Sequence, residues 1–329
     1  MHPLNLITGT RLAESMRTPI TILMKKEIIA ILAALVCLLT LVTGVIYTRA
    51  TDLTRKIPAS SLGLPTDSTF HKPVVFVGVV SRYPPTVIYH GYQPIMDYLT
   101  QNSPYKFVLR LNTTYQQTVD ELADGRVSAA FLGTYIYMQA YDRHAVTSLL
   151  KPLNENGEPL SHAVVITRLE SSIHNIEDLR GKRVAFPSQE SFSGNWLPLY
   201  ELKKHNISLS DLDSVHYFPH HQSVVYHVLK GSFDAGVVKE RVAKEFLPRG
   251  LRIVYTSRPI PGSPIVISKQ CANAVATALR DALLRIDVRR AEDRAMVADW
   301  DPEFQYGFTS ASDSDYNALR SILRSVGGK

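Results

Sequence analysis

Between residues 73 and 256, short apolar runs alternate with amphipathic segments, and few architectures accommodate such a pattern. The runs PVVFVGVV, YKFVLRL and VSAAFLG have the length and residue types of buried strands. Helical patterns are found in YQPIMDYLTQ, TTYQQTVDELADG and TYIYMQAYD, with a loop expected at SRYPPTVIYHG. Strands that alternate with short helices predict an α/β fold with largely parallel sheets.

The same rhythm resumes after the polar stretch NENGEPLSH. Strands are predicted at AVVIT, KRVAF, SVHYF and FDAGVV, and helices at NIEDLRG, GNWLPLYELKKH, HHQSVVYHVLKG and KERVAKEF. The chain after LRIVYTS and PIPGSPIVIS is mostly helical in pattern. Two βα units with a helical tail predict two lobes with a cleft between them.

An uncharged run, Ile28–Tyr47, precedes this α/β region and has the length of a bilayer-spanning helix. The basic leader is long for a cleavable signal peptide, and YTRA is a poor cleavage site. We therefore expect a retained signal anchor, with cleavage as the alternative. Residues 1–27 would be cytoplasmic, 28–47 would span the inner membrane once, and the Pro/Ser/Thr-rich linker 48–72 would lead to a periplasmic domain.

Charge and cysteine usage exclude several functions. The net charge is +6, with Lys and Arg scattered among acids, so no nucleic-acid surface is expected. Cys37 lies in the apolar run and Cys271 is alone, which leaves no thiolate metal site. In HYFPHH, His216 and His220 lie on opposite sides of a strand end, so neither a metal site nor a cofactor is predicted.

Ligands of open α/β sheets bind beyond the carboxyl ends of the strands. The loops at those ends supply hydroxyls, imidazoles, amides and helix N-termini but few acids, which suits a small anion. These loops are Ser81–Tyr89, Asn112–Tyr115, Leu132–Tyr135, Pro187–Gly194, Pro219–Gln222 and Val238–Arg241.

The stretch FPSQESFSGNW passes from a strand through small hydroxyl residues into a helix start. Ser191 and Ser193 could bind an oxyanion there, or could be an ordinary loop with a helix cap. His221 could donate to an anion or simply cap and pack, and Tyr115 could be a core residue. A serine hydrolase would need a GxSxG elbow, which ESFSGN does not match, so no enzyme is predicted.

The soluble part, about Val74 to Tyr316, resembles the substrate-binding proteins of phosphonate, phosphite and phosphate ABC transporters. The resemblance lies in YQPIMDYL, TTYQQTVDELADGRVSAAFLG, IEDLRGKRVAF with SFSG, HHQSVVYHVLKGSFDAG and RPIPGSPIVISK, in that order. It implies the bilobal periplasmic-binding fold. Lobe one would comprise residues 73–160 and 256–329, and lobe two residues 161–255.

The family grips its oxyanion with a Ser-Thr-Ser triplet before Gly, which corresponds here to Ser191, Phe192 and Ser193. Phe192 thus replaces a hydroxyl and would leave only its amide. The ligand-contacting histidine falls on His221, beside His220, and a lobe-one tyrosine falls on Tyr115.

Other family positions have changed. An aromatic residue of some members corresponds to Ser161, next to His162, and the acid of IPGDP is Ser263 here. The acid that meets an amino group aligns near Glu240 or Arg241. The loss of acids disfavours an aminophosphonate, whereas phosphate, phosphite, a simple phosphonate or another oxyanion remain open.

The resemblance implies a solute-binding protein that delivers a small oxyanion to an ABC permease, and the expected anchor would tether it to the membrane. Two alternatives remain from the sequence. The domain could be a sensor that reports its ligand to a membrane signalling partner, or, less favoured, an enzyme built on the same fold.

Overall fold

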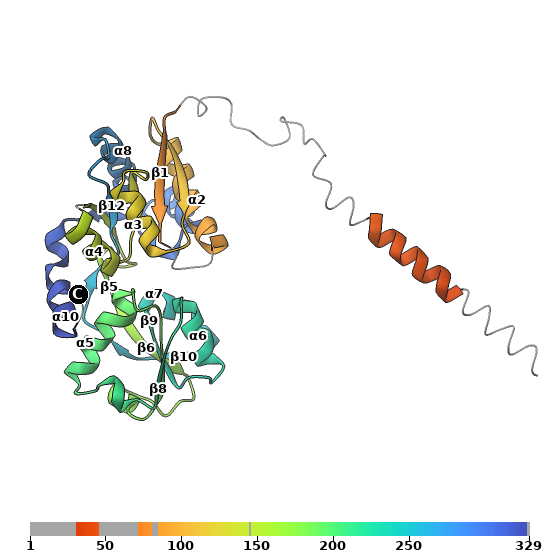
Figure 1. Ribbon diagram of the computed structural model, residues 1–329, viewed down its shortest axis with the longest axis vertical. Helices are drawn as coiled ribbons and strands as arrows, with labels where there is room; N and C mark the ends of the chain where they lie inside the picture. Colours follow the sequence, from red (N-terminus) through yellow and green to blue (C-terminus); the bar gives the residue numbers. More distant parts are fainter. Residues whose placement is uncertain (1–30, 46–71, 81–84, 145, 328–329) are drawn as a thin grey trace, which may run out of the picture. The chain divides into compact units, whose positions relative to one another are not determined.

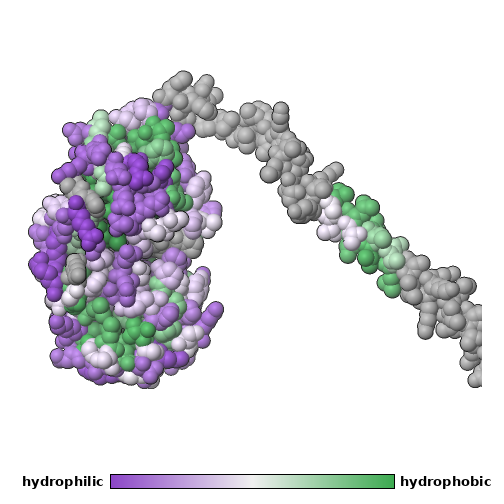
Figure 2. Space-filling view, viewed as in Figure 1, coloured by the Kyte–Doolittle hydropathy of each residue, from purple (hydrophilic) through white to green (hydrophobic). Residues whose placement is uncertain are grey.

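The computed structural model describes residues 31–45, 72–80, 85–144 and 146–327. The chain divides into two compact units, Met1–Thr66 and Asp67–Lys329. In the first, residues 31–45 form a helix whose apolar side chains are exposed (Figure 2). Within the described ranges, no helix is both long and apolar enough to cross a bilayer. The ends of the predicted anchor, 28–30 and 46–47, lie outside those ranges, as do residues 1–27 and 48–71.

Lobe one of the second unit is built on a six-stranded sheet (Figure 1). Its order is β13-β4-β12-β3-β1-β2, where β1 is parallel to β2 and β3, and the remaining pairs are antiparallel. The prediction of largely parallel sheets is therefore wrong here, because the chain re-enters the sheet from the other lobe. The strands are β1 (Val74–Val79), β2 (Lys106–Leu111), β3 (Ala129–Phe131), β4 (Thr147–Pro152), β12 (Ile265–Ile267) and β13 (Phe308–Ser310).

Lobe two is built on a five-stranded sheet of order β10-β6-β9-β7-β8. Strand β7 is parallel to β8 and β9, whereas β6 is antiparallel to both β9 and β10, so this sheet is also mixed. The strands are β6 (Ala163–Arg168), β7 (Arg183–Phe186), β8 (Ser214–Tyr217), β9 (Ala235–Lys239) and β10 (Leu251–Thr256).

The chain passes between the two sheets twice, and the crossings pair with each other. Strand β5 (Leu160–Ser161) runs antiparallel to β11 (Ile260–Pro261). A Cβ on Gly262 would meet Pro152 Cδ and Cγ at 3.0 Å, so this crossing packs tightly against the end of β4. The paired crossings form the hinge of the bilobal fold.

Helices cover both sheets (Figure 1). Lobe one carries α2 (Pro85–Gln101), α3 (Tyr115–Ala123), α4 (Thr134–His144), α8 (Asn273–Leu284) and α9 (Ala291–Met296), and lobe two carries α5 (Leu197–Lys204), α6 (His221–Leu229) and α7 (Glu240–Phe246). The chain ends in α10 (Asn317–Ser325). Short 3₁₀ turns lie at Glu177–Leu179, Leu209–Asp211, Leu247–Arg249, Val297–Asp299, Pro302–Phe304 and Asp313–Tyr316.

Helix α2 begins earlier than the sequence predicts. The segment expected to be a loop is helical from Pro85, while residues 81–84 lie outside the described ranges. Gly91, the last residue of that expected loop, lies inside the helix and allows a close contact. A Cβ there would meet Asp301 Cβ at 3.1 Å, and the Asp301 amide donates to the Gly91 carbonyl at 2.9 Å.

The end of the chain packs against both lobes. Tyr316 is fully buried and donates to the Gly262 carbonyl of the hinge at 3.0 Å. Lys203 of α5 donates to the Ser325 carbonyl at 2.7 Å. One apolar cluster includes Phe192 and Leu197 from lobe two together with residues of α3, α4 and α10. The two lobes are therefore joined by apolar contact as well as by the hinge.

Gly236 of β9 lets α6 approach the sheet. An added methyl group would lie 2.5 Å from Val224 Cγ1 and 2.9 Å from Val228 Cγ2, both buried in α6. We expect Gly236→Ala to lower the free energy of unfolding by about 1–3 kcal/mol, since overpacking forces neighbours out of place. Urea denaturation measures this, with Gly133→Ala as the control because its methyl meets nothing within 4 Å. Equal stability of the two variants would contradict the close packing of α6.

Candidate anion-binding site

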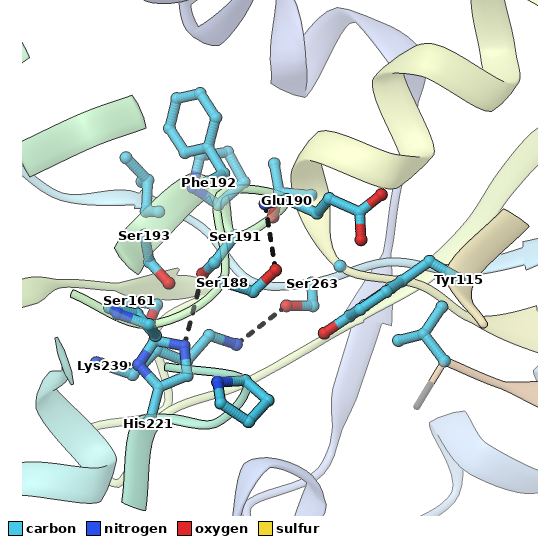
Figure 3. A pocket seen from close by; sticks show the side chains of 17 residues that line it. Tyr115, Ser161, Ser188, Glu190, Ser191, Phe192, Ser193, His221, Lys239 and Ser263 are labelled. Atoms are coloured by element: carbon cyan, nitrogen blue, oxygen red, sulfur yellow. Dashed lines mark hydrogen bonds between the residues drawn. The ribbon is translucent and has the colours of Figure 1, made fainter. Parts of the chain in front are cut away.

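A cavity lies between the lobes, where the strands of both sheets and the hinge converge (Figure 3). The volume that water-sized molecules can reach is about 40 Å³, which is a few times the space that one water needs and suits a small ligand. Its lining residues are Val80, Tyr115, Gly133, Thr134, Ser161, Pro187, Ser188, Glu190, Ser191, Phe192, Ser193, Pro219, His221, Lys239, Ile260, Pro261 and Ser263.

The serine turn, residues 188–194, follows β7, and its last three residues begin a π-helical segment, Phe192–Trp196. Ser191 caps this segment, because its Oγ accepts from the Gly194 amide at 3.0 Å. The helix thus starts at Phe192, two residues before the predicted start, and continues as α5 from Leu197. The first amides of a helix have no carbonyl partner within it, so this turn offers backbone donors to an anion.

Gly194 is required by the crowding behind the turn. A Cβ there would overlap the ring of Pro187 and would lie 3.0 Å from His221 Cε1. The absence of a side chain therefore lets the serine turn and the histidine of α6 share one small space.

Phe192 contributes its backbone to the site rather than its ring. Its side chain is 2% exposed and belongs to the apolar cluster that joins the lobes. Figure 3 shows the ring pointing away from the cavity. A phenylalanine at this position therefore adds apolar contact between the lobes and offers the site only its backbone amide.

The hydrogen bonds of His221 run in one direction. Its Nδ1 accepts from the Lys239 backbone amide at 3.2 Å, so the proton of the neutral ring is on Nε2. Nε2 lies 3.3 Å from Ser191 Oγ and donates to it. Ser191 Oγ also accepts from Gly194, so both of its lone pairs are used and its own proton is left to donate.

Ser193 and Tyr115 bring further hydroxyls to the cavity. Ser193 is 3% exposed, and Figure 3 shows its hydroxyl directed into the cavity. Tyr115 opens α3 after Thr114, whose side chain accepts from the Gln117 amide at 3.1 Å as the N-cap. In Figure 3, the phenol of Tyr115 points toward Ser263. Both lobes therefore supply donors to one space.

Sequence reasoning did not single out Lys239. It ends β9, and its Nζ donates to Ser263 Oγ at 3.0 Å and to Glu303 Oε1 at 2.7 Å. The resemblance directed attention to Glu240 and Arg241, which line a neighbouring cavity instead. Its position in the sequence could have indicated a role in the site, because Lys239 directly follows the predicted strand FDAGVV.

Most residues proposed from the sequence meet at the cavity, and one does not. Ser161 lines it, but His162 is absent from its lining, because successive side chains of an extended chain point to opposite sides. His162 Nδ1 instead lies 2.9 Å from the Ser257 carbonyl, to which it must donate. Tyr115, Ser191, Phe192, Ser193, His221 and Ser263 all line the cavity, together with Thr134, Ser188, Glu190 and Lys239, which were not proposed.

Glu190 is the one carboxylate among the described lining residues. It lies on the serine turn, and its side chain extends toward Tyr115 (Figure 3). Partial burial raises the pKa of its carboxyl above the ordinary value. Across the described ranges, no cluster of three or more His, Cys, Asp or Glu side chains could hold a metal ion.

Comparison with known proteins identifies the family. The model for the periplasmic substrate-binding protein of phosphonate ABC transporters matches residues 77–316. The chain belongs to this family. It is a substrate-binding protein of the ABC-transporter type, as the sequence resemblance predicted.

Individual relatives are distant in sequence but close in fold. The phosphate-import protein PhnD of Mycolicibacterium smegmatis is 24% identical over 264 residues, which cover 73% of this chain and 81% of that protein. A binding-protein component of a phosphonate ABC transporter from Pseudomonas aeruginosa superposes with a TM-score of 0.68 at 19% identity, covering 78% of this chain and 87% of that one. PhnD1 of Prochlorococcus marinus, solved with methylphosphonate, has a TM-score of 0.68 at 17% identity, with coverages of 78% and 99%. These structures confirm the bilobal fold.

Glu190 gives the site a testable pH dependence. Its ionised form repels an anion and its protonated form does not, so Glu190→Gln should bind phosphate about three- to tenfold more tightly at pH 8. That gain should shrink toward none as the pH falls through the raised pKa of Glu190. Calorimetric titration of both proteins at each pH measures the ratio of their affinities.

The matched control is Glu170→Gln, an exposed carboxylate beyond the end of β6 that does not line the cavity. It should leave the affinity unchanged at every pH. A gain of equal size in both variants would mean that only the overall charge matters, and it would remove Glu190 from the site.

Proposed function

We propose that the cavity binds a small tetrahedral oxyanion of the phosphate, phosphite or simple phosphonate class, which the protein delivers to an ABC permease. The observation that carries this is the directed series of hydrogen bonds from Lys239 through His221 to Ser191. Since both lone pairs of Ser191 are used, its hydroxyl must act as a donor. A group that can only donate favours a ligand that accepts.

The character of the remaining lining supports the same class of ligand. Ser193 and Tyr115 add hydroxyls, and the π-helical segment adds backbone amides at its N-terminus. Hydrogen bonds to a charged acceptor are about twice as strong as neutral ones, and these donors are held in place before the ligand arrives. The names of two relatives agree, since one imports phosphate and another was solved with methylphosphonate.

Binding would also bring the lobes together. Tyr115 comes from lobe one, whereas Ser191, Ser193 and His221 come from lobe two. A ligand shifts a conformational equilibrium only through contacts that one state makes better than the other. An anion held by both sets of donors therefore favours the closed arrangement, which a permease can recognise.

We infer further that the apolar run Ile28–Tyr47 anchors the protein in the inner membrane, with the folded domain on the periplasmic side. The support is the uncharged run itself and the exposed apolar side chains of helix 31–45. The full-length protein should stay in the membrane fraction after carbonate washing. Replacing Leu35 and Leu39 with Arg should release it, because each charge near the centre of the span costs about 2.5–3.5 kcal/mol. Recovery of the unaltered chain in the soluble fraction would exclude an anchor.

The oxyanion assignment is tested by calorimetry of the full-length protein with phosphate, phosphite, methylphosphonate and sulfate. At least one of the phosphorus anions should bind. Ser193→Ala should then weaken that binding by about tenfold or more, the usual loss for a hydrogen bond to a charged group. Ser232→Ala, at an exposed position outside the cavity, is the control and should bind normally. If none of the four anions bound, the proposed function would be wrong.

A further inference from the structure

A buried ion pair lies against the ligand cavity and joins the two lobes. Lys239 belongs to β9 of lobe two, and Glu303 follows α9 in the C-terminal part of lobe one. Their side chains are 12% and 7% exposed, and Nζ lies 2.7 Å from Oε1. Charges removed from water in this way act on a neighbouring ligand more strongly than exposed charges do.

The two charges of this pair do not face the cavity equally. Lys239 and Ser263 both line it, and Lys239 also borders the neighbouring cavity beside the hinge, whereas Glu303 lines only that neighbouring cavity. Figure 3 shows the ammonium group directed toward Ser263 at the cavity. A ligand therefore meets the cationic half of the pair, and the carboxylate lies behind it.

Ser263 adds a second hydrogen-bond donor beside the ammonium group of Lys239. Its Oγ accepts from Lys239 Nζ at 3.0 Å, so its hydroxyl proton is available to an acceptor on the ligand. Ser263 is only 4% exposed, and its position is fixed by the crossing between β11 and β12. Ammonium and hydroxyl together form a wall that donates hydrogen bonds and carries positive charge.

We propose that Lys239 selects the ligand by charge: it excludes phosphonates that carry an ammonium group and admits oxyanions whose remainder is neutral or anionic. This inference rests on the proposed oxyanion-binding function. An ammonium substituent would face a desolvated like charge, a juxtaposition that costs several kcal/mol. A methyl, hydroxyl or carboxylate substituent meets no such repulsion.

Glu190 is the competing candidate for recognition of an ammonium group. It is the single acid among the cavity-lining residues that the structure describes, but it is more exposed to water than Lys239. Lys239 is nearly buried, so its field is less screened by water. The structure therefore favours rejection of an ammonium group over its capture, and the two residues can be tested separately.

The test compares methylphosphonate, phosphonoacetate and 2-aminoethylphosphonate by calorimetry of the full-length protein in phosphate-free buffer. The unaltered protein should bind methylphosphonate about a hundredfold more tightly than 2-aminoethylphosphonate, as repulsion between like charges predicts. In Lys239→Gln this ratio should fall to about tenfold or less. Because this variant leaves Glu303 buried without its cation, the double variant Lys239→Gln/Glu303→Gln is measured as well and should show the same fall.

Lys244→Gln is the matched control. Lys244 also joins the lobes through an ion pair, with Glu155, but it does not line the ligand cavity. It should leave the ratio between the two ligands unchanged, which separates charge selection from a general loosening of the lobes.

The outcomes distinguish the two levels of the proposal. If methylphosphonate binds and neither Lys239 variant lowers the ratio, charge selection by Lys239 is wrong while the oxyanion function stands. If Glu190→Gln alters the binding of 2-aminoethylphosphonate and the Lys239 variants do not, Glu190 is the residue that senses the substituent. If the unaltered protein binds no phosphonate or phosphate, the oxyanion function itself fails.

Discussion

The hydrogen bond from the Lys239 amide to Nδ1 of His221 determines what the cavity can bind. Because this bond fixes the proton on Nε2, the imidazole donates to Ser191, and Ser191 in turn can only donate. A ring turned the other way would present an acceptor and would repel an anion. A backbone amide at the end of a strand therefore determines that the site donates hydrogen bonds to its ligand. A side-chain substitution cannot remove that amide.

That amide is held in place by the way α6 packs on β9. Gly236 brings the helix close to the strand, and Gly194 allows the serine turn to approach the histidine ring. At each of these two positions, an added Cβ would push the packed elements apart by a few tenths of an ångström or more. Hydrogen bonds weaken steeply with distance and angle, so the close packing at these two glycines keeps the hydrogen-bonding groups of the site at the right distances.

The sequence predicted the local parts of this structure better than the distant ones. The serine turn and the cap of α3 depend on neighbouring residues, and short motifs locate the turn and narrow the cap to Thr113 or Thr114, of which the structure shows Thr114. Strands β4 and β13 depend on partners far along the chain, and neither was predicted. Lys239 was missed for a related reason: its importance comes from Ser263 and Glu303, which reach it only after the chain has crossed the hinge again.

Two kinds of contact hold the lobes, and they contribute differently. Basic residues at the start of α7 meet acids of lobe one, as in the pair between Arg241 and Asp301 at 3.9 Å. Such pairs lose hydration as they form, so their net contribution is small and they mainly fix which surfaces meet. The apolar cluster around Phe192 has no such cost and favours contact in proportion to the area buried. The ring of Phe192 favours contact between the lobes whether or not a ligand is present, so a closed arrangement held partly by this contact requires less free energy from a ligand.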